Sequence, residues 1–236
     1  MKPGYILSLG VLTLSVSSVT AQVLYQQNFD ALASGSTTVA NFGGYGAVDN
    51  IGGSGWQVQG GNGSGTISLM AGINANGVGG SQALFGTWDT SAGLDYTWNQ
   101  YSYYGVGGAG AGGTLANINI SLSLYMSGSS SSTPITIQAL QDGGNTAMSY
   151  TPTLTDGQYT FVSFSLAQAT ASGTVPFDPT APFWFRISHG NGGFGFDNPN
   201  TVQIDNVMIQ VVPEPSSLAL AALGVAALLG YRRRRG

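Results

Sequence analysis

The clearest pattern in the chain is a strict alternation of apolar and polar residues over positions 116–126. Asn, Ser and Tyr residues separate the apolar positions, which are Ile118, Ile120, Leu122, Leu124 and Met126. A period of two places every apolar side chain on one face of an extended strand. The pattern therefore predicts a half-buried antiparallel β-strand.

Seven further segments, bounded by Gly, Asp, Asn or Pro clusters, also predict strands. They are 23–29, 65–70, 82–88, 134–141, 159–166, 183–188 and 201–211. Eight or more short strands without a helical period predict an all-β fold, an antiparallel β-sandwich. In the last segment, Val202 and Ile204 share one phase, whereas the apolar positions from Val207 onward share the other. A β-bulge at Asp205 and Asn206 would absorb this change of phase.

The amino-acid composition restricts the kinds of partner that this sandwich can bind. Hydrophobic residues make up 42% of the chain and charged residues 7%, which is enough apolar surface for a core and unlike a disordered chain. The region 22–212 contains one Arg, no Lys and nine Asp, which gives a net charge of −8. So few cations cannot neutralise phosphates, and nucleic acid and anionic lipid headgroups are therefore excluded as partners of this region. The chain has no cysteine, so disulfides play no part in the fold.

The two ends of the chain have the composition of targeting segments. Residues 1–21 follow the order of a signal peptide, with Lys2, an apolar stretch and small residues up to Ala21. We expect signal peptidase to cleave between Ala21 and Gln22, which makes 22–211 the ectodomain.

The segment 212–236 contains Pro213, Glu214 and Pro215, an uncharged stretch at 216–231, and then Arg232, Arg233, Arg234 and Arg235. As a helix, the apolar stretch would reach about 24 Å, against a hydrocarbon core of about 30 Å. The arginines obey the positive-inside rule. We therefore expect a single transmembrane helix with its C-terminus in the cytoplasm.

This tail resembles the PEP-CTERM sorting signal, which is also described as an ice-binding protein C-terminal domain. The resemblance implies recognition by an exosortase, a membrane transpeptidase-like enzyme of bacteria that make exopolysaccharide, and removal of the helix near the Pro-Glu-Pro. It implies an exported protein, held in the envelope membrane as a precursor and then found at the cell surface or in the extracellular matrix of a biofilm. A plain tail anchor that stays intact is the alternative.

The ectodomain resembles the galactose-binding-like jelly roll of many carbohydrate-binding modules. The resemblance rests on a first strand that ends near Asp30, on the segment 183–187, and on a last strand that contains Asp205. In this fold the first and last strands are often neighbours, and several related modules hold a structural calcium there. The resemblance therefore makes Asp30 and Asp205 candidate calcium ligands. Alternatively, both are turn and bulge residues that bind backbone N–H groups.

Aromatic residues gather before a glycine-rich stretch at 105–113. They are Trp88, Trp98, Tyr101, Tyr103 and Tyr104, and their rings could stack on sugars. Packing in the core or at its rim is the alternative.

Catalytic groups are scarce in the sequence. Glu214 is the only glutamate and His189 the only histidine, so the sequence offers few residues that could form a catalytic carboxylate pair or a Ser-His-Asp triad. No cofactor is expected apart from the possible calcium. The sequence predicts a non-catalytic, exported surface or matrix protein associated with exopolysaccharide. A carbohydrate-binding module is the alternative, and a secreted hydrolase is the least supported class.

Overall fold

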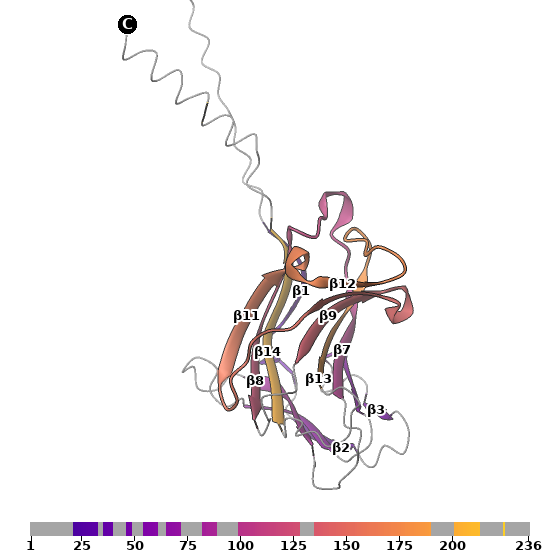
Figure 1. Ribbon diagram of the computed structural model, residues 1–236. Helices are drawn as coiled ribbons and strands as arrows, with labels where there is room; N and C mark the ends of the chain where they lie inside the picture. Colours follow the sequence, from indigo (N-terminus) through magenta and orange to yellow (C-terminus); the bar gives the residue numbers. More distant parts are fainter. Residues whose placement is uncertain are drawn as a thin grey trace, which may run out of the picture. The chain divides into compact units, whose positions relative to one another are not determined.

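Two antiparallel sheets pack face to face in the ectodomain (Figure 1). The computed structural model describes residues 21–32, 35–39, 46–48, 54–60, 65–71, 82–88, 99–127, 135–189 and 201–212, together with Gly224. Both sheets belong to one compact unit, Ala21–Val212. The fold is an all-β, antiparallel jelly-roll sandwich, as the sequence predicted.

The first sheet, called sheet A here, is organised around the last strand. Its seven strands are β1 (Gln22–Gln27), β2 (Gly35–Val39), β5 (Gly65–Ala71), β6 (Gln82–Trp88), β8 (Ile118–Ser127), β11 (Tyr159–Ser165) and β14 (Thr201–Val211). The order is β11-β8-β14-β6-β5-β2, and β1 also pairs with β14. β8 runs along one side of β14, whereas β6 and β1 share the other side.

The second sheet, sheet B, also consists of seven strands. They are β3 (Gly46–Val48), β4 (Trp56–Gly60), β7 (Asn99–Val106), β9 (Thr136–Gln141), β10 (Thr146–Tyr150), β12 (Thr170–Gly173) and β13 (Phe183–His189). Their order is β12-β10-β9-β13-β7-β4-β3. Among the described residues, the short 3-10 helices η2 (Gly110–Gly112), η3 (Asp142–Gly144) and η4 (Leu166–Gln168) lie in connections between strands.

The core lies between the two sheets, where each strand contributes every second side chain. Sheet A contributes the alternating residues of β8 together with Val162, Phe164, Val202, Ile204, Val207 and Ile209, and sheet B contributes Ile137, Phe183, Phe185 and Ile187. Trp56 is fully buried, packs edge-on against Phe185 at 5.9 Å between ring centroids, and donates from Nε1 to the Tyr25 hydroxyl at 2.6 Å. Each large apolar side chain buried in this way contributes about 1.5–3 kcal/mol to stability.

The predicted bulge is confirmed and has a structural role. The register of β14 against β8 shifts between Asp205 and Met208, and Asn206 adopts a φ of 51°. β6 pairs with β14 before this point, and β1 pairs with it after this point. The bulge therefore separates β6 and β1, the two partners that share one side of β14, and the first and last strands are neighbours as expected.

The strand predictions of the sequence are confirmed for β1, β5, β6, β8, β9, β11, β13 and β14, with the observed bounds given above. The remaining strands, β2, β3, β4, β7, β10 and β12, were not predicted because Gly, Ser, Thr and Tyr interrupt their alternation. Residues 1–20 of the predicted signal peptide and the apolar segment 216–231 lie outside the described residues, apart from Gly224, which is helical. The described residues include no helix with the length and hydropathy needed to cross a bilayer.

Candidate functional site

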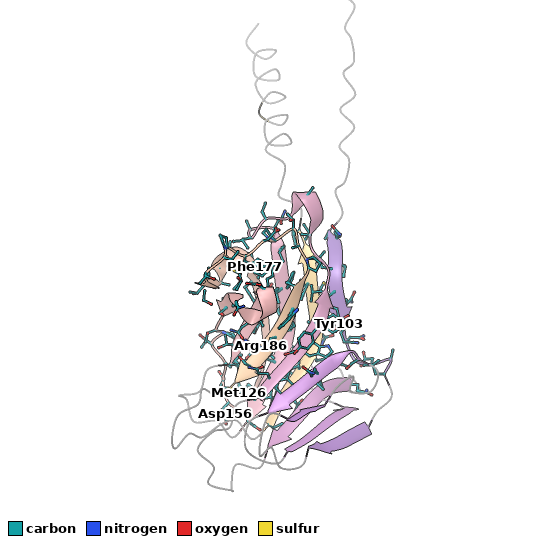
Figure 2. The ribbon with its side chains drawn as sticks, turned by 90° about the vertical axis from the view of Figure 1, so that its right-hand side faces the viewer. Tyr103, Met126, Asp156, Phe177 and Arg186 are labelled. Atoms are coloured by element: carbon teal, nitrogen blue, oxygen red, sulfur yellow. The ribbon has the colours of Figure 1, made fainter. Side chains whose placement is uncertain are left out.

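The outer face of sheet B, the face turned away from the core, combines aromatic and polar side chains. Phe183, Phe185 and Ile187 are buried in the core, and alternation turns Trp184 and Arg186 to the opposite face of β13. Both of these side chains are partly exposed. Figure 2 views the molecule from the side of sheet B, and Arg186 lies towards the middle of that sheet.

A row of hydrogen bonds crosses four adjacent strands on this face. Arg186 in β13 donates from Nε to Gln138 Oε1 in β9 at 2.8 Å, and from Nη1 to Gln100 Oε1 in β7 at 3.3 Å. Gln138 in turn donates from Nε2 to Ser149 Oγ in β10 at 3.1 Å. Arg186 donates to both of its neighbours, and Gln138 accepts through Oε1 and donates through Nε2, so the amide of Gln138 is held in one orientation.

An aromatic pair lies beside this row. The rings of Tyr104 and Trp184 meet edge to face at 4.8 Å between centroids, and Tyr104 is 45% exposed. The Tyr104 hydroxyl donates to Gln57 Oε1 in β4 at 2.6 Å, which fixes the ring across the neighbouring strand. The two rings thus form a partly exposed apolar surface with polar groups at its edge.

Electrostatically, this face carries one positive charge. Burial lowers the pKa of Arg186, and the nearby Tyr104 hydroxyl acts in the opposite direction. The ordinary pKa of an arginine lies far above neutral pH, so the guanidinium remains charged at neutral pH. The described aspartates lie elsewhere, in the turn after β1, in η3, in the connections 151–158 and 174–182, and in β14 of sheet A; they are Asp30, Asp142, Asp156, Asp178 and Asp205.

Of the aromatic residues that the sequence marked as candidates, Tyr104 lies on this face. Tyr101 is fully buried, and Tyr103 is half-buried with its ring 4.0 Å from that of Tyr25, so both belong to the packing between the sheets. Trp88 lies in β6 of the other sheet, opposite Gly65, and its side chain is not among those described. Trp98 lies outside the described residues. The structure therefore does not bring the five aromatics together as one surface.

The two candidate calcium ligands lie in the turn and the bulge. Asp30 is exposed and accepts from the backbone N–H of Gln82 at 2.7 Å, which ties the end of β1 to the start of β6. Asp205 is 1% exposed and accepts from the backbone N–H of Asn206 at 2.6 Å. Within the described part of the chain, no group of three or more acidic or histidine residues gathers as a metal site. Both carboxylates accept from backbone N–H groups, and calcium binding stays a prediction.

Sequence reasoning missed most of the site on sheet B. Gln57, Gln100 and Gln138 lie in strands or positions without a distinctive pattern. A signal was present at 183–187, where tryptophan and arginine occupy the polar phase between three buried apolar residues. A tryptophan on the outward phase, beside the only arginine of the ectodomain, is the feature of the sequence that marks this face.

The predicted processing residues flank the folded unit. Ala21 and Gln22 are exposed at the start of β1, and Gln22 pairs with Val211 at the end of β14. The backbone N–H of Val212 donates to Asn117 O at 2.7 Å. The sorting residues Pro213, Glu214, Pro215 and Arg232 to Arg235 lie outside the described residues.

Comparison with solved structures returned proteins of low similarity. A family 11 carbohydrate-binding module from Clostridium thermocellum, in complex with a β-1,3-1,4-mixed-linked tetrasaccharide, is 14% identical with a TM-score of 0.44, over 75% of this chain and 96% of that one. The CBM22-1 xylan-binding domain of Xyn10C from Paenibacillus barcinonensis is 11% identical with a TM-score of 0.39, over 84% and 99%. The enzymatically active domain of tailspike protein 4 from bacteriophage CBA120 is 14% identical with a TM-score of 0.42, over 70% of this chain and 21% of that one. At TM-scores below 0.5, none of these proteins identifies a ligand of this chain.

No curated protein matches the sequence. Residues 211–235 match the PEP-CTERM protein-sorting motif. This match confirms the resemblance of the tail and covers the Pro-Glu-Pro, the apolar segment and the arginines. The chain therefore carries a PEP-CTERM sorting motif, the signal of an exported protein processed by an exosortase.

Proposed function

We propose that this chain is a non-catalytic protein of the bacterial surface or extracellular matrix, and that its ectodomain binds polysaccharide through the outer face of sheet B. The observation that carries the proposal is the partly exposed aromatic pair, Tyr104 and Trp184, beside a row of hydrogen-bonded amides and one guanidinium. Sugar rings have apolar C–H faces and polar hydroxyl edges. A site for them combines aromatic surfaces with a few positioned hydrogen-bonding groups, which is the arrangement on this face.

The arrangement favours binding over catalysis. Hydrolysis of a glycosidic bond commonly uses two carboxyl groups on either side of the bond. None of the described aspartates lies on the outer face of sheet B. The described polar groups on that face are amides, hydroxyls and one guanidinium. These groups can orient a sugar, but they supply neither a general acid nor a nucleophile at neutral pH.

The sorting motif supports the location of the protein. Signal peptidase would release the N-terminus at Ala21 and Gln22, and the segment 216–231 would hold the precursor in the envelope membrane. Exosortase would then free the ectodomain at the cell surface or into the matrix of a biofilm. A polysaccharide-binding ectodomain would keep the released protein attached to exopolysaccharide after the sorting step.

The proposal is tested by measuring how the ectodomain, residues 22–212, binds polysaccharides. Affinity electrophoresis and calorimetry would use the exopolysaccharide purified from the host, with soluble glucan, xylan and galactan beside it. Replacing Trp184 or Tyr104 with alanine should weaken binding by roughly tenfold or more, since exposed aromatic anchors commonly dominate such surfaces. Tyr104→Phe should have a smaller effect, because it removes the hydroxyl bonded to Gln57 and keeps the ring.

Phe161 provides a matched control, since it is an aromatic residue in β11 of sheet A and is 64% exposed. Phe161→Ala removes a similar exposed ring from the opposite sheet and should leave the affinity unchanged. The proposal fails if the ectodomain binds none of these polymers, or if Phe161→Ala weakens binding as much as Trp184→Ala does.

A further inference from the structure

Arg186 is the only cation in the region 22–212, which otherwise carries nine aspartates. It lies on β13 near the middle of sheet B rather than at the rim of the sandwich (Figure 2). Its side chain is partly buried, so holding the charge there has a desolvation cost. The one cation of the ectodomain therefore lies on the same face as the aromatic pair of Tyr104 and Trp184.

The contacts of this guanidinium are with neutral groups. Nε and Nη1 donate to the amide oxygens of Gln138 and Gln100, and no ion pair joins Arg186 to a carboxylate among the described residues. Buried or partly buried charges are usually paired, because neutral acceptors compensate a charge only in part. The positive charge therefore lacks a counter-charge within the described part of the domain.

The same contacts leave a particular edge of the guanidinium available. An arginine has five N–H donors, and two of them are engaged by the glutamines. The three that remain belong to Nη1 and Nη2, which lie side by side and can hold both oxygens of a carboxylate. Gln138, itself bonded to Ser149, keeps the plane of the guanidinium in one orientation for such a ligand.

We propose that the polysaccharide bound by this face contains uronic acid units, with a sugar carboxylate on the Nη1 and Nη2 edge of Arg186 and a neighbouring ring on Trp184 and Tyr104. The inference rests on the proposed function of the same face, and it adds the chemical class of the ligand. The net charge of −8 repels a densely charged polymer over about 8–10 Å at physiological salt. Widely spaced carboxylates therefore fit this ectodomain better than a continuous polyanion.

The test compares acidic polymers with their neutral counterparts on the unaltered ectodomain. Glucuronoxylan, alginate and polygalacturonate would each be titrated beside a preparation of the same polymer whose carboxyl groups have been reduced to hydroxymethyl groups. A charge-assisted hydrogen bond of about 1.5–3 kcal/mol corresponds to a preference of roughly tenfold to a hundredfold for an acidic form. Glucuronoxylan, which has the most widely spaced carboxylates of the three, should give the largest preference.

Variants of Arg186 then test whether this residue causes the preference for the acidic polymers. Arg186→Gln should bind the acidic and reduced forms equally, and Arg186→Lys should keep only part of the difference because it loses the planar fork. Thermal melting checks that each variant is folded. For the unaltered protein, free glucuronate should compete for the site and free glucose should not.

The outcomes separate this inference from the function on which it rests. Equal binding of acidic and reduced polymers overturns the inference and leaves polysaccharide binding in place. An acidic preference that survives in a folded Arg186→Gln variant also overturns it. Binding to none of the polymers, acidic or neutral, overturns both.

Discussion

At the scale of single residues, the described side chains show how polar groups are accommodated in a sandwich with few charges. The hydroxyl of Tyr159 in β11 donates to Gln203 Oε1 in β14, on the outer face of sheet A. Burial raises the pKa of this phenol, and the nearby Asp205 raises it further. Burial also raises the pKa of Tyr25, whose hydroxyl accepts from Trp56 in the core.

These shifts predict a loss of stability at high pH. The folded pKa of each phenol lies above its unfolded value of about 10, so the stability gained from the neutral phenol is complete below about pH 10 and declines as the pH rises beyond it. Tyr159→Phe should reduce the slope of unfolding free energy against pH in that range, because one of the contributing groups is gone. Urea unfolding between about pH 8 and about pH 11.5 measures the slope. An unchanged slope in the variant would mean that Tyr159 does not contribute to it.

At the scale of elements, β8 carries the strongest sequence signal and lies between β11 and β14 in sheet A. Its apolar phase is buried from Ile118 to Met126, and its neighbours β11 and β14 are paired along most of its length. β14 depends on its bulge, because a one-residue change of register turns every later side chain to the other face. The bulge lets both halves of β14 direct their apolar residues to the core.

This arrangement makes a specific prediction for two adjacent residues of β8. Leu122→Ala should lower the free energy of unfolding by about 2–5 kcal/mol, since the side chain is fully buried and its removal leaves a cavity. Ser121→Ala, one position away on the outer face, should change it by less than about 0.5 kcal/mol. Denaturant unfolding of residues 22–212 gives both values. A larger loss for Ser121→Ala than for Leu122→Ala would contradict the observed orientation of β8.

At the scale of the whole molecule, sorting and folding use parts of the chain that overlap only at Val211 and Val212. The ectodomain is a compact unit that extends to Val212, and the sorting motif occupies residues 211–235. Replacing Pro213, Glu214 and Pro215 with alanine should therefore leave the ectodomain folded and exported, but it should block release. The precursor should accumulate in the membrane, because the apolar segment alone is enough for retention.

Cell fractionation and mass spectrometry of the mature protein measure this outcome. Replacing Ser216 and Ser217 with alanine is a control outside the Pro-Glu-Pro, and release should then proceed. If the triple variant is released as fully as the parent, the Pro-Glu-Pro has no part in sorting and a simple anchor accounts for the tail.

Local patterns in the sequence determined the sorting signal of this protein, the all-β class, eight of the strands and the bulge in β14. Each of these depends on neighbours in the chain: a run of apolar residues, a period of two, or a change of phase at Asp205 and Asn206. The sorting motif is read in the same way, because its parts follow one another within 25 residues.

Only the tertiary structure decided which side chains share the outer face of sheet B. Gln57, Tyr104, Gln138 and Arg186 come from four strands that are up to 129 positions apart in the chain, and sheet order and register bring them together. Alternation alone could show that Tyr101 and Tyr103 share one face of a strand and Tyr104 the other, but not which face is buried. That choice depends on the packing of two sheets, which local sequence does not specify.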